Sequence, residues 1–398
     1  MTPSPESAER RAQRFQSAVL ALGFRPFFLL AGLGATALMV PWLVAYSGGG
    51  LPDNYYGPYE WHPHEMLFGY AMAVVAGFLL TAVRNWTSLP TPVGGSLAAL
   101  AILWLAGRVI PFLDPAFPGA VIAIVDCAFI PALAYAIGRP LIEARQHRNL
   151  FVLALLAVLL IANLMVHLER QGFLEIGYGR ANILALETIV MLMVVMGGRV
   201  IPFFTTGALG GEVRRVAWIE RTAVPLVGVM AAVDLFWPGS LAVGAVAGVA
   251  AVIHALRLAS WYQPGTHRAP LLWVLHLGYA WVVLGLVLRS LAAFDLAPLM
   301  LAWHAFAAGG IGVLTLGMMS RVALGHTGRA LRVGGAMTAA FVLVNLAAVM
   351  RVLIPLILPD TQRGLIVASG LLWIAAFLVF AAVYWPILTR PRVDGRPG

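Results

Sequence analysis

The sequence predicts an all-α, polytopic membrane protein with about twelve transmembrane helices. Hydrophobic side chains make up 61% of the 398 residues and charged side chains only 11%, whereas roughly a quarter of the residues of a soluble domain are charged. The chain also contains twelve apolar runs, each close to the 20 or so residues that a helix needs to cross a bilayer. Dividing 398 residues by twelve leaves about 33 for each crossing and its connection, so no soluble domain of useful size fits between the spans.

Turn signals separate the runs and set the expected order of the elements. Pro and Gly in Leu89–Gly95, Asp114–Gly119 and Trp237–Ser240 predict tight connections. The polar stretch 1–15 lacks the basic start and the small-residue cleavage site of a secretory signal, so we expect 1–25 to be retained as a tail, with 389–398 as a second tail. The predicted spans within the single domain 26–388 are 26–46, 65–83, 95–113, 117–138, 150–169, 181–205, 217–236, 240–260, 271–291, 300–324, 333–356 and 364–388.

Arginine accounts for all 26 basic residues, and its distribution predicts the orientation. With the N-terminus in the cytoplasm, 18 of the 26 fall on the cytoplasmic side, while the opposite loops hold only Arg170, Arg180 and Arg363. Because cytoplasmic loops carry the excess of basic residues, both termini are expected to be cytoplasmic. The formal charge of +9 therefore reflects orientation in the lipid bilayer and does not indicate nucleic acid.

Several chemistries have no support in the sequence. The absence of Lys excludes a Schiff base and a phosphate-binding loop. The single cysteine, Cys127, excludes an internal disulfide and an all-Cys metal site. We also find no Ser-His-Asp order, no dinucleotide-binding glycine motif and no Cys-x-x-Cys-His motif for covalent haem.

Histidine is the residue type that best indicates a function. His62, His64, His167 and His304 lie at or near the outer ends of predicted spans, and His276 lies within the ninth span towards its inner side. Ionisable groups at membrane depth are costly and usually have a partner or a function. Neutral imidazole is the commonest protein ligand for copper, zinc and haem iron, so these five are candidate metal ligands. Pro63 fits the first turn of a helix, which places His62 and His64 at a rigid helix entry where a metal could be held. The alternative for His62 and its neighbours is a helix start in the aromatic belt.

A weak internal repeat relates the second span to the tenth. In each, a histidine is followed by glycines at offsets of five and thirteen residues, which lie on one side of a helix. Such a face admits either a flat ligand or a neighbouring helix. The matched residues are His64, Gly69 and Gly77 in the second span and His304, Gly309 and Gly317 in the tenth.

Three arginines near the outer ends of odd-numbered spans are candidates for holding the propionates of a haem. Arg108, Arg289 and Arg351 would supply the cations that this cofactor needs, with the glycine faces as its apolar slot. The alternative is an ion pair within the protein at the membrane edge. The acids that follow these arginines are Asp114, Asp295 and Asp360. Within apolar runs, Asp126 and Glu187 could relay protons, as could Asp234 near a loop.

At these same segments the chain resembles the NnrS family of bacterial membrane proteins. The resemblance implies a twelve-span protein of the bacterial inner membrane that contains haem b and copper and acts in denitrification and in the response to nitric oxide and nitrosative stress. The stretches that carry it are Gly23-Phe-Arg-Pro-Phe-Phe28, Trp61-His-Pro-His-Glu-Met-Leu-Phe-Gly-Tyr70, Gly77-Phe-Leu-Leu-Thr-Ala-Val-Arg-Asn-Trp86, Gly198-Arg-Val-Ile-Pro-Phe-Phe204 and Trp303-His304 through Met319-Ser-Arg321 to Gly325-His-Thr-Gly328.

Two functions of different class follow. In the first, outer histidines hold haem and copper that bind nitric oxide or a related nitrogen oxide, and redox turnover as an oxidoreductase stays open because it needs an electron donor that the sequence does not identify. In the second, the chain is a transporter of a metal or a metal complex, in which repeated helices rock about a central site. A haem absorption band with bound iron would favour the first function over the second.

Overall fold

The computed structural model describes residues 18–50, 52–177, 179–359 and 362–396. Every regular element within these ranges is a helix, which confirms the predicted all-α class. Most of the predicted N-terminal tail, residues 1–17, lies outside the described residues.

Eleven helical segments are long and apolar enough to cross a membrane, so the chain is a multi-pass membrane protein. Their bounds agree with the predicted spans to within a few residues at most ends. They are Phe24–Tyr46, Tyr59–Thr87, Gly94–Asp114, Gly119–Glu143, His147–Arg170, Arg180–Leu209, Leu241–Trp261, Pro270–Ala293, Leu299–His326, Gly335–Ile357 and Arg363–Thr389.

The predicted seventh span is present as a helix, α11 (Ala217–Phe236), but it is not among these eleven. Its 20 residues include Glu220, Arg221 and Asp234, and every 18-residue window within it contains all three charged side chains. Two of them are neutralised inside the protein, since Glu220 pairs with Arg257 and Asp234 pairs with Arg289. Pairing of these charges within the bundle removes much of the cost of charge at membrane depth.

Kinks, proline residues and changes of helix type divide several spans into shorter elements. The elements are η1 (Ala18–Leu20), α2 (Phe24–Ala37), α3 (Met39–Tyr46), α4 (Pro58–His64), η2 (Glu65–Ala71), α5 (Met72–Thr87), α6 (Gly94–Val109), η3 (Ile110–Ala116), α7 (Gly119–Cys127), α8 (Phe129–Glu143), η4 (His147–Asn149), α9 (Phe151–Arg170), α10 (Arg180–Leu209), α11, α12 (Leu241–Trp261), η5 (Thr266–Arg268), α13 (Pro270–Ala293), α14 (Leu299–His304), η6 (Ala305–Ile311), α15 (Gly312–His326), α16 (Gly335–Ala348), η7 (Val349–Leu353), α17 (Ile354–Ile357) and α18 (Gln362–Thr389).

The second span begins earlier than predicted, which corrects the placement of two candidate ligands. Its helix starts at Pro58, directly after Gly57 with φ of 81°, so Pro63 lies inside the helix and not in its first turn. His62 and His64 therefore occupy the last turn of α4, where the packed bundle surrounds them. The reason is that proline suits a first helical turn, and Pro58 takes that position before Pro63 does.

The second and tenth spans share an unusual geometry at matched places. Directly after His64 the helix widens into the π-helical segment η2, and directly after His304 it widens into η6; both segments are seven residues long. π-Helical turns are rare and occur frequently at functional sites. This match supports the internal repeat that the His and Gly spacing indicates.

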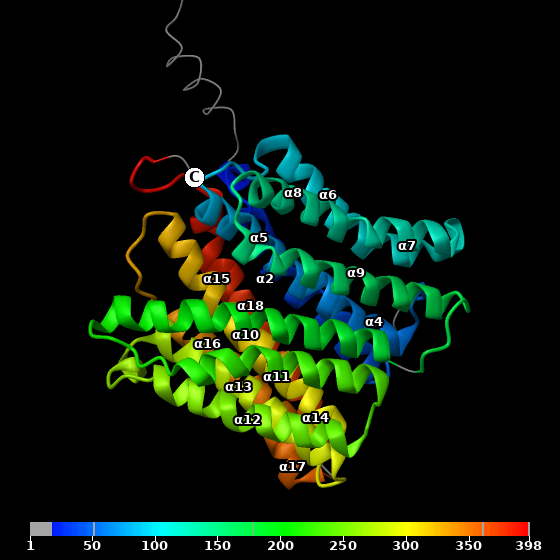
Figure 1. Cartoon of the computed structure of the whole chain (residues 1–398). Helices are drawn as coiled ribbons and strands as arrows, with labels where there is room; N and C mark the ends of the chain where they lie inside the picture. Colours follow the sequence, from blue (N-terminus) through cyan, green and yellow to red (C-terminus); the bar gives the residue numbers. More distant parts are fainter. Residues whose placement is uncertain (1–17, 51, 178, 360–361, 397–398) are drawn as a thin grey trace, which may run out of the picture.

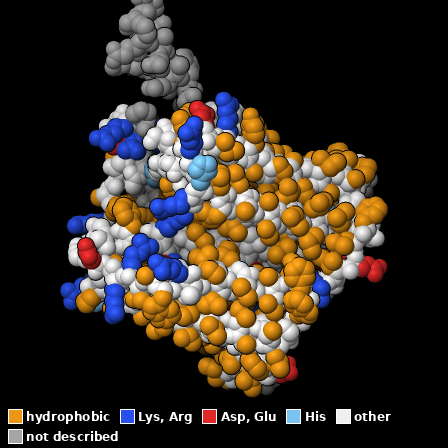
Figure 2. Space-filling model, viewed as in Figure 1, with side chains coloured by type: hydrophobic (Ala, Val, Ile, Leu, Met, Phe, Trp, Pro, Cys, Tyr) orange, Lys and Arg blue, Asp and Glu red, His pale blue; other side chains and the backbone are white. Residues whose placement is uncertain are grey.

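The 30-residue helix α10 lies against both repeat helices and contacts η2 and η6. In Figure 1 it crosses the lower half of the bundle, with α11, α12 and α13 beside it and the group α6 to α9 above. A hydrogen bond of 2.5 Å between the hydroxyls of Tyr70 and Thr315 joins the two repeat helices directly. Among the side chains visible in Figure 2, the basic ones gather mainly along one edge of the molecule, and hydrophobic side chains cover the broad face, as a bilayer requires.

Candidate metal centre

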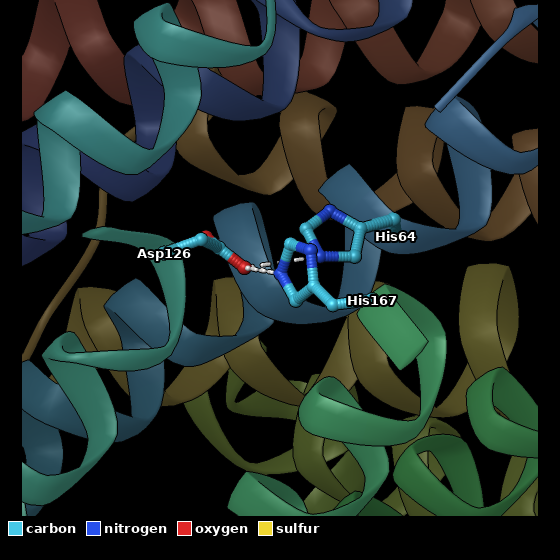
Figure 3. Close-up of side chains that lie close together, drawn as sticks. All are labelled: His64, Asp126 and His167. Carbon is cyan, nitrogen blue, oxygen red and sulfur yellow. Dashed lines mark hydrogen bonds and ion pairs between the residues drawn. The ribbon is translucent and has the colours of Figure 1, made fainter. Parts of the chain in front are cut away.

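Three buried side chains from different spans bring metal-ligating atoms together. His64, Asp126 and His167 each offer one ligand atom, and these three atoms all lie within 4.8 Å of one another. His64 and His167 are 0% exposed and Asp126 is 4% exposed. Figure 3 shows the two imidazole rings on one side of the carboxylate, to which dashed lines connect them. Two imidazole nitrogens and a carboxylate oxygen form a donor set that suits several divalent transition metals.

The helices that hold these residues meet on one side of the bundle. His64 is the last residue of α4, Asp126 is in the short helix α7, and His167 is in the last turn of α9. Helices α7 and α9 contact each other along this region. The three ligands are therefore 41 to 103 residues apart in the sequence, and only the packing of the spans brings them together.

The two rings point the same nitrogen at the same oxygen. Nε2 of His64 and Nε2 of His167 each lie 3.2 Å from Oδ2 of Asp126. Asn163 completes this inner arrangement, because its Nδ2 donates to Asp126 Oδ2 at 2.8 Å and its Oδ1 lies 3.0 Å from His64 Nε2. Ligand atoms that converge in this way need little rearrangement to hold a cation.

The outward-facing nitrogen of each ring also has a partner. Nδ1 of His64 lies 3.3 Å from Oε1 of Glu65, and Nδ1 of His167 lies 3.4 Å from the hydroxyl of Tyr55. Metal-ligating histidines almost always bond their second ring nitrogen to such a group, which fixes the tautomer and the orientation of the ring. The arrangement therefore has the outer contacts of a metal site as well as the inner ones.

The charges around the centre favour a cation. Arg108 forms an ion pair with Asp126 and a second with Glu65, whose Oε2 lies 3.0 Å from Arg108 Nε. With neutral imidazoles, the two carboxylates and one guanidinium leave a formal charge of −1 in a buried site. An uncompensated buried charge is costly, and either a second proton on His64, whose two ring nitrogens both face carboxylates, or a bound cation neutralises it.

Two tyrosines in the segment before α4 cover the centre. The ring of Tyr56 stacks on His64 with centroids 4.1 Å apart, and Tyr55 contacts His167 through its hydroxyl. Burial raises the pKa of Tyr55 to about 12, and burial also raises the pKa of Tyr56 well above its ordinary value. Both phenols therefore stay neutral near neutral pH, so they seal the site without adding charge.

His62 and His304 lie at a second place, together with Arg351. Arg351 interacts electrostatically with both histidines, and His62 interacts with His304. His62 stacks on Trp42 at 4.3 Å between centroids, and its buried Nδ1 has no hydrogen-bond partner among the described residues. Nδ1 of His304 bonds the carbonyl of Met300 at 2.8 Å, which leaves Nε2 available. The structure thus separates His62 and His304 from the His64 centre.

His276 is not part of either group. Its Nδ1 donates to the carbonyl of Leu272 at 2.9 Å within α13, and its ring contacts Tyr262 in the segment between α12 and α13. Of the five candidate ligands in the sequence, the structure unites His64 with His167, pairs His62 with His304, and leaves His276 alone.

The three arginines predicted to hold haem propionates have different surroundings. Arg108 belongs to the metal centre, and Arg289 forms a two-bond ion pair with Asp234 at 2.6 and 3.0 Å. Glu187 interacts with the same Asp234. The acids that precede the loops, Asp114 and Asp295, are not the ones that pair with these arginines, because the helical geometry turns each guanidinium into the bundle towards Asp126 or Asp234. Asp360, the expected neighbour of Arg351, lies outside the described residues.

The four matched glycines pack against protein side chains. An added Cβ would come within 2.9 Å of Glu65 at Gly69, 2.9 Å of Phe28 at Gly77, 2.5 Å of Trp281 at Gly309 and 2.7 Å of Val274 at Gly317. The glycine faces therefore serve close helix packing in this structure, which is the second of the two uses that their spacing allows.

The sequence indicates Asp126 as a proton relay and not as a metal ligand. Asn163 and Tyr55 are not among the site residues predicted from it. A signal for Asn163 was present, because it precedes His167 by four residues and so lies on the same helix face. Asp126 also stands in an otherwise apolar run, where a carboxylate needs a buried partner. No sequence spacing indicates that this partner is Arg108 on another span.

A multi-pass helical membrane protein with a buried His/Asp/His cluster is the class that the fold and the site define. A family model described as NnrS protein matches residues 18–392, nearly the whole described chain. The chain belongs to the NnrS family, as its sequence motifs indicate. A search of curated proteins finds no match to the chain.

Proposed function

We propose that this protein binds a metal ion at His64, Asp126 and His167 and uses it to bind nitric oxide or a related nitrogen oxide in the inner membrane of a bacterium. The observation that carries the proposal is the buried convergence of three ligand atoms within 4.8 Å. The family to which the chain belongs supplies the link to nitric oxide and to the nitrosative stress response, including denitrification.

Copper is the metal that we propose for this centre. Imidazole and carboxylate ligands suit Cu(II), and copper binds more tightly than the other divalent first-row metals at a given nitrogen and oxygen site. When bound, copper supplies an open coordination position for a small ligand and a redox couple. The residues of the chain hold the ion, neutralise the surrounding charge through Arg108, and exclude water behind Tyr55 and Tyr56.

Haem b fits this structure only in part. His62 and His304 have ring nitrogens available as axial ligands, and Arg351 lies near both as a cation for a propionate. The glycine faces offer no slot for the macrocycle, because side chains of Trp281 and Val274 fill the space beside Gly309 and Gly317. A haem at His62 and His304 would therefore require the tenth span and α13 to move apart. We derive no chemical step through it.

Metal analysis of the purified protein tests the proposal. After expression with added copper, we expect copper near one ion per chain, and a Cu(II) electron paramagnetic resonance spectrum with hyperfine lines from two imidazole nitrogens. His64→Ala and His167→Ala should each lose the bound ion, whereas His147→Ala, at an exposed position of η4, should retain it. Full copper content in both centre variants would contradict the proposed site.

Nitric oxide binding is measured on the same samples. Addition of nitric oxide to the reduced, copper-loaded protein should give an infrared N–O stretching band from the bound molecule. This band should be absent in His64→Ala. A protein that holds copper but gives no such band would retain the metal centre and disprove the proposed ligand. Absorption in the Soret region, compared between the parent protein and His304→Ala, tests the haem site separately.

A further inference from the structure

A second cavity lies between the two repeat helices, apart from the metal centre. Its volume is about 70 Å³. Ala71 and Val75 line it from the second span, Met193 and Met196 from α10, and Met318 from the tenth span. The cavity therefore sits where the two halves of the internal repeat meet, with α10 against both.

The wall of this cavity offers nothing that would hold water. Among its lining residues only Thr315 has a polar side chain. That hydroxyl is already engaged, since Thr315 Oγ1 donates to the carbonyl of Ile311 at 2.6 Å and lies 2.5 Å from the hydroxyl of Tyr70. A buried water needs two to four polar partners, and apolar cavities without them stay dry.

The volume of the cavity suits a small molecule. An apolar cavity of about 150 Å³ accepts benzene or xenon, so about 70 Å³ accommodates a diatomic molecule or a xenon atom. We propose that this cavity binds a small uncharged gas, with nitric oxide as the physiological ligand. The identity of the gas rests on the proposed function, whereas the existence of the binding site does not.

Two features suit the cavity to such a ligand. The three methionines have flexible, polarisable thioethers, which adapt to ligands of slightly different shape. The helix formed by η2 and α5 is also shared with the metal centre. Phe68 and Met72 on this helix line a cavity of about 10 Å³ beside Arg108 and Asp126, while Ala71 and Val75 line the larger one. A gas held at the repeat interface is thus separated from the centre by one helix.

Xenon binding tests the site, because xenon is uncharged and does not ligate the metal. We expect ¹²⁹Xe nuclear magnetic resonance of the full-length protein in lipid nanodiscs to show a bound signal. Leu192→Phe adds volume to the cavity wall and should weaken xenon binding about tenfold or more, since a misfit of one methylene group in an apolar pocket costs about 10-fold or more.

Leu164→Phe is the matched control, because the same substitution is made at a residue of α9 that is 45% exposed; it should leave xenon binding unchanged. Absence of a bound xenon signal in the parent protein would overturn the proposal, as would equal binding in Leu192→Phe, or an acyl chain found in the cavity at high resolution. Xenon bound by a metal-free His64→Ala protein that no longer binds nitric oxide would support the cavity independently of the proposed function.

Discussion

Asp126 concentrates more interactions than any other residue of the candidate metal centre. Its Oδ2 lies 3.2 Å from each of two histidine nitrogens and accepts a hydrogen bond from Asn163, while its Oδ1 pairs with Arg108. A carboxylate at membrane depth would be costly without such partners. The same contacts that keep Asp126 charged also aim it at the place where a cation would sit.

Asp126→Asn is expected to reduce copper affinity while preserving the shape of the side chain. Loss of a group that hydrogen-bonds to a metal ligand typically lowers metal affinity 10–100-fold. Removal of the negative charge of a ligand should therefore lower the affinity at least about tenfold. Competition with a copper chelator measures the change. Asp114→Asn removes an acid that is outside the cluster and should bind copper as the parent protein does; equal affinity in Asp126→Asn would exclude this residue as a ligand.

Tyr55 predicts a pH dependence that can be read optically. Because burial raises its pKa to about 12 in the folded protein, the neutral phenol is favoured by folding. The contribution of the neutral Tyr55 phenol to the free energy of unfolding is fully present below the ordinary pKa of 10. It is lost as the pH rises from 10 through 12. The difference in phenolate absorbance at 295 nm between the parent protein and Tyr55→Phe should therefore stay near zero up to pH 10 and emerge only towards pH 12. A difference that emerges below pH 10 would show that Tyr55 is solvated.

At the scale of the element, the internal repeat appears as two matched π-helical segments, η2 and η6. Each begins directly after a histidine, and each contains the first glycine of the repeat, Gly69 or Gly309. A π-helical turn shifts the following side chains around the helix axis. Glycine at these places lets a neighbouring group approach closely, which is Glu65 at the first segment and the ring of Trp281 at the second.

Gly309→Ala should therefore destabilise the protein. Its Cβ would lie 2.5 Å from the Trp281 ring, and overpacking of this kind costs about 1–3 kcal/mol. We expect a lower midpoint of thermal unfolding, measured by light scattering or by tryptophan fluorescence in detergent. Gly95→Ala is the control, because no atom lies within 4 Å of the added carbon and alanine is the better helix former. An unchanged midpoint in Gly309→Ala would mean that Trp281 can move aside at little cost.

At the scale of the whole molecule, charge distribution and apolar surface define the protein as a membrane bundle. Basic side chains gather along one edge (Figure 2), and eleven described helices meet the requirements for a span. Helix α11 carries three charges and is the element on which the count of twelve depends. Its two acidic residues are paired with Arg257 and Arg289 on neighbouring helices, so it can join the bundle in spite of them.

If α11 crosses the membrane, the loops at its two ends lie on opposite sides. We expect Glu212→Cys to be cytoplasmic and Trp237→Cys, whose parent side chain is 65% exposed, to be periplasmic, each in a Cys127→Ser background. In intact cells a membrane-impermeant maleimide should label only Trp237→Cys, and after lysis it should label both. Labelling of both positions in intact cells, or of neither, would contradict a twelfth span and cytoplasmic termini.

The sequence by itself determined the class of protein, because apolar length and the scarcity of charge are properties of composition and do not depend on how the helices pack. It also determined which residue types carry the chemistry, since histidines in an apolar chain stand out in any arrangement. Only the tertiary structure decided which of them meet. His64 joins His167 and Asp126, whereas His304, its counterpart in the repeat, lies near His62, because a repeat places equivalent residues on equivalent helices and not at one point. The partners of Arg108 and Arg289 were likewise decided by helix packing, which turns both side chains away from the nearest acid in the sequence and towards acids on other spans.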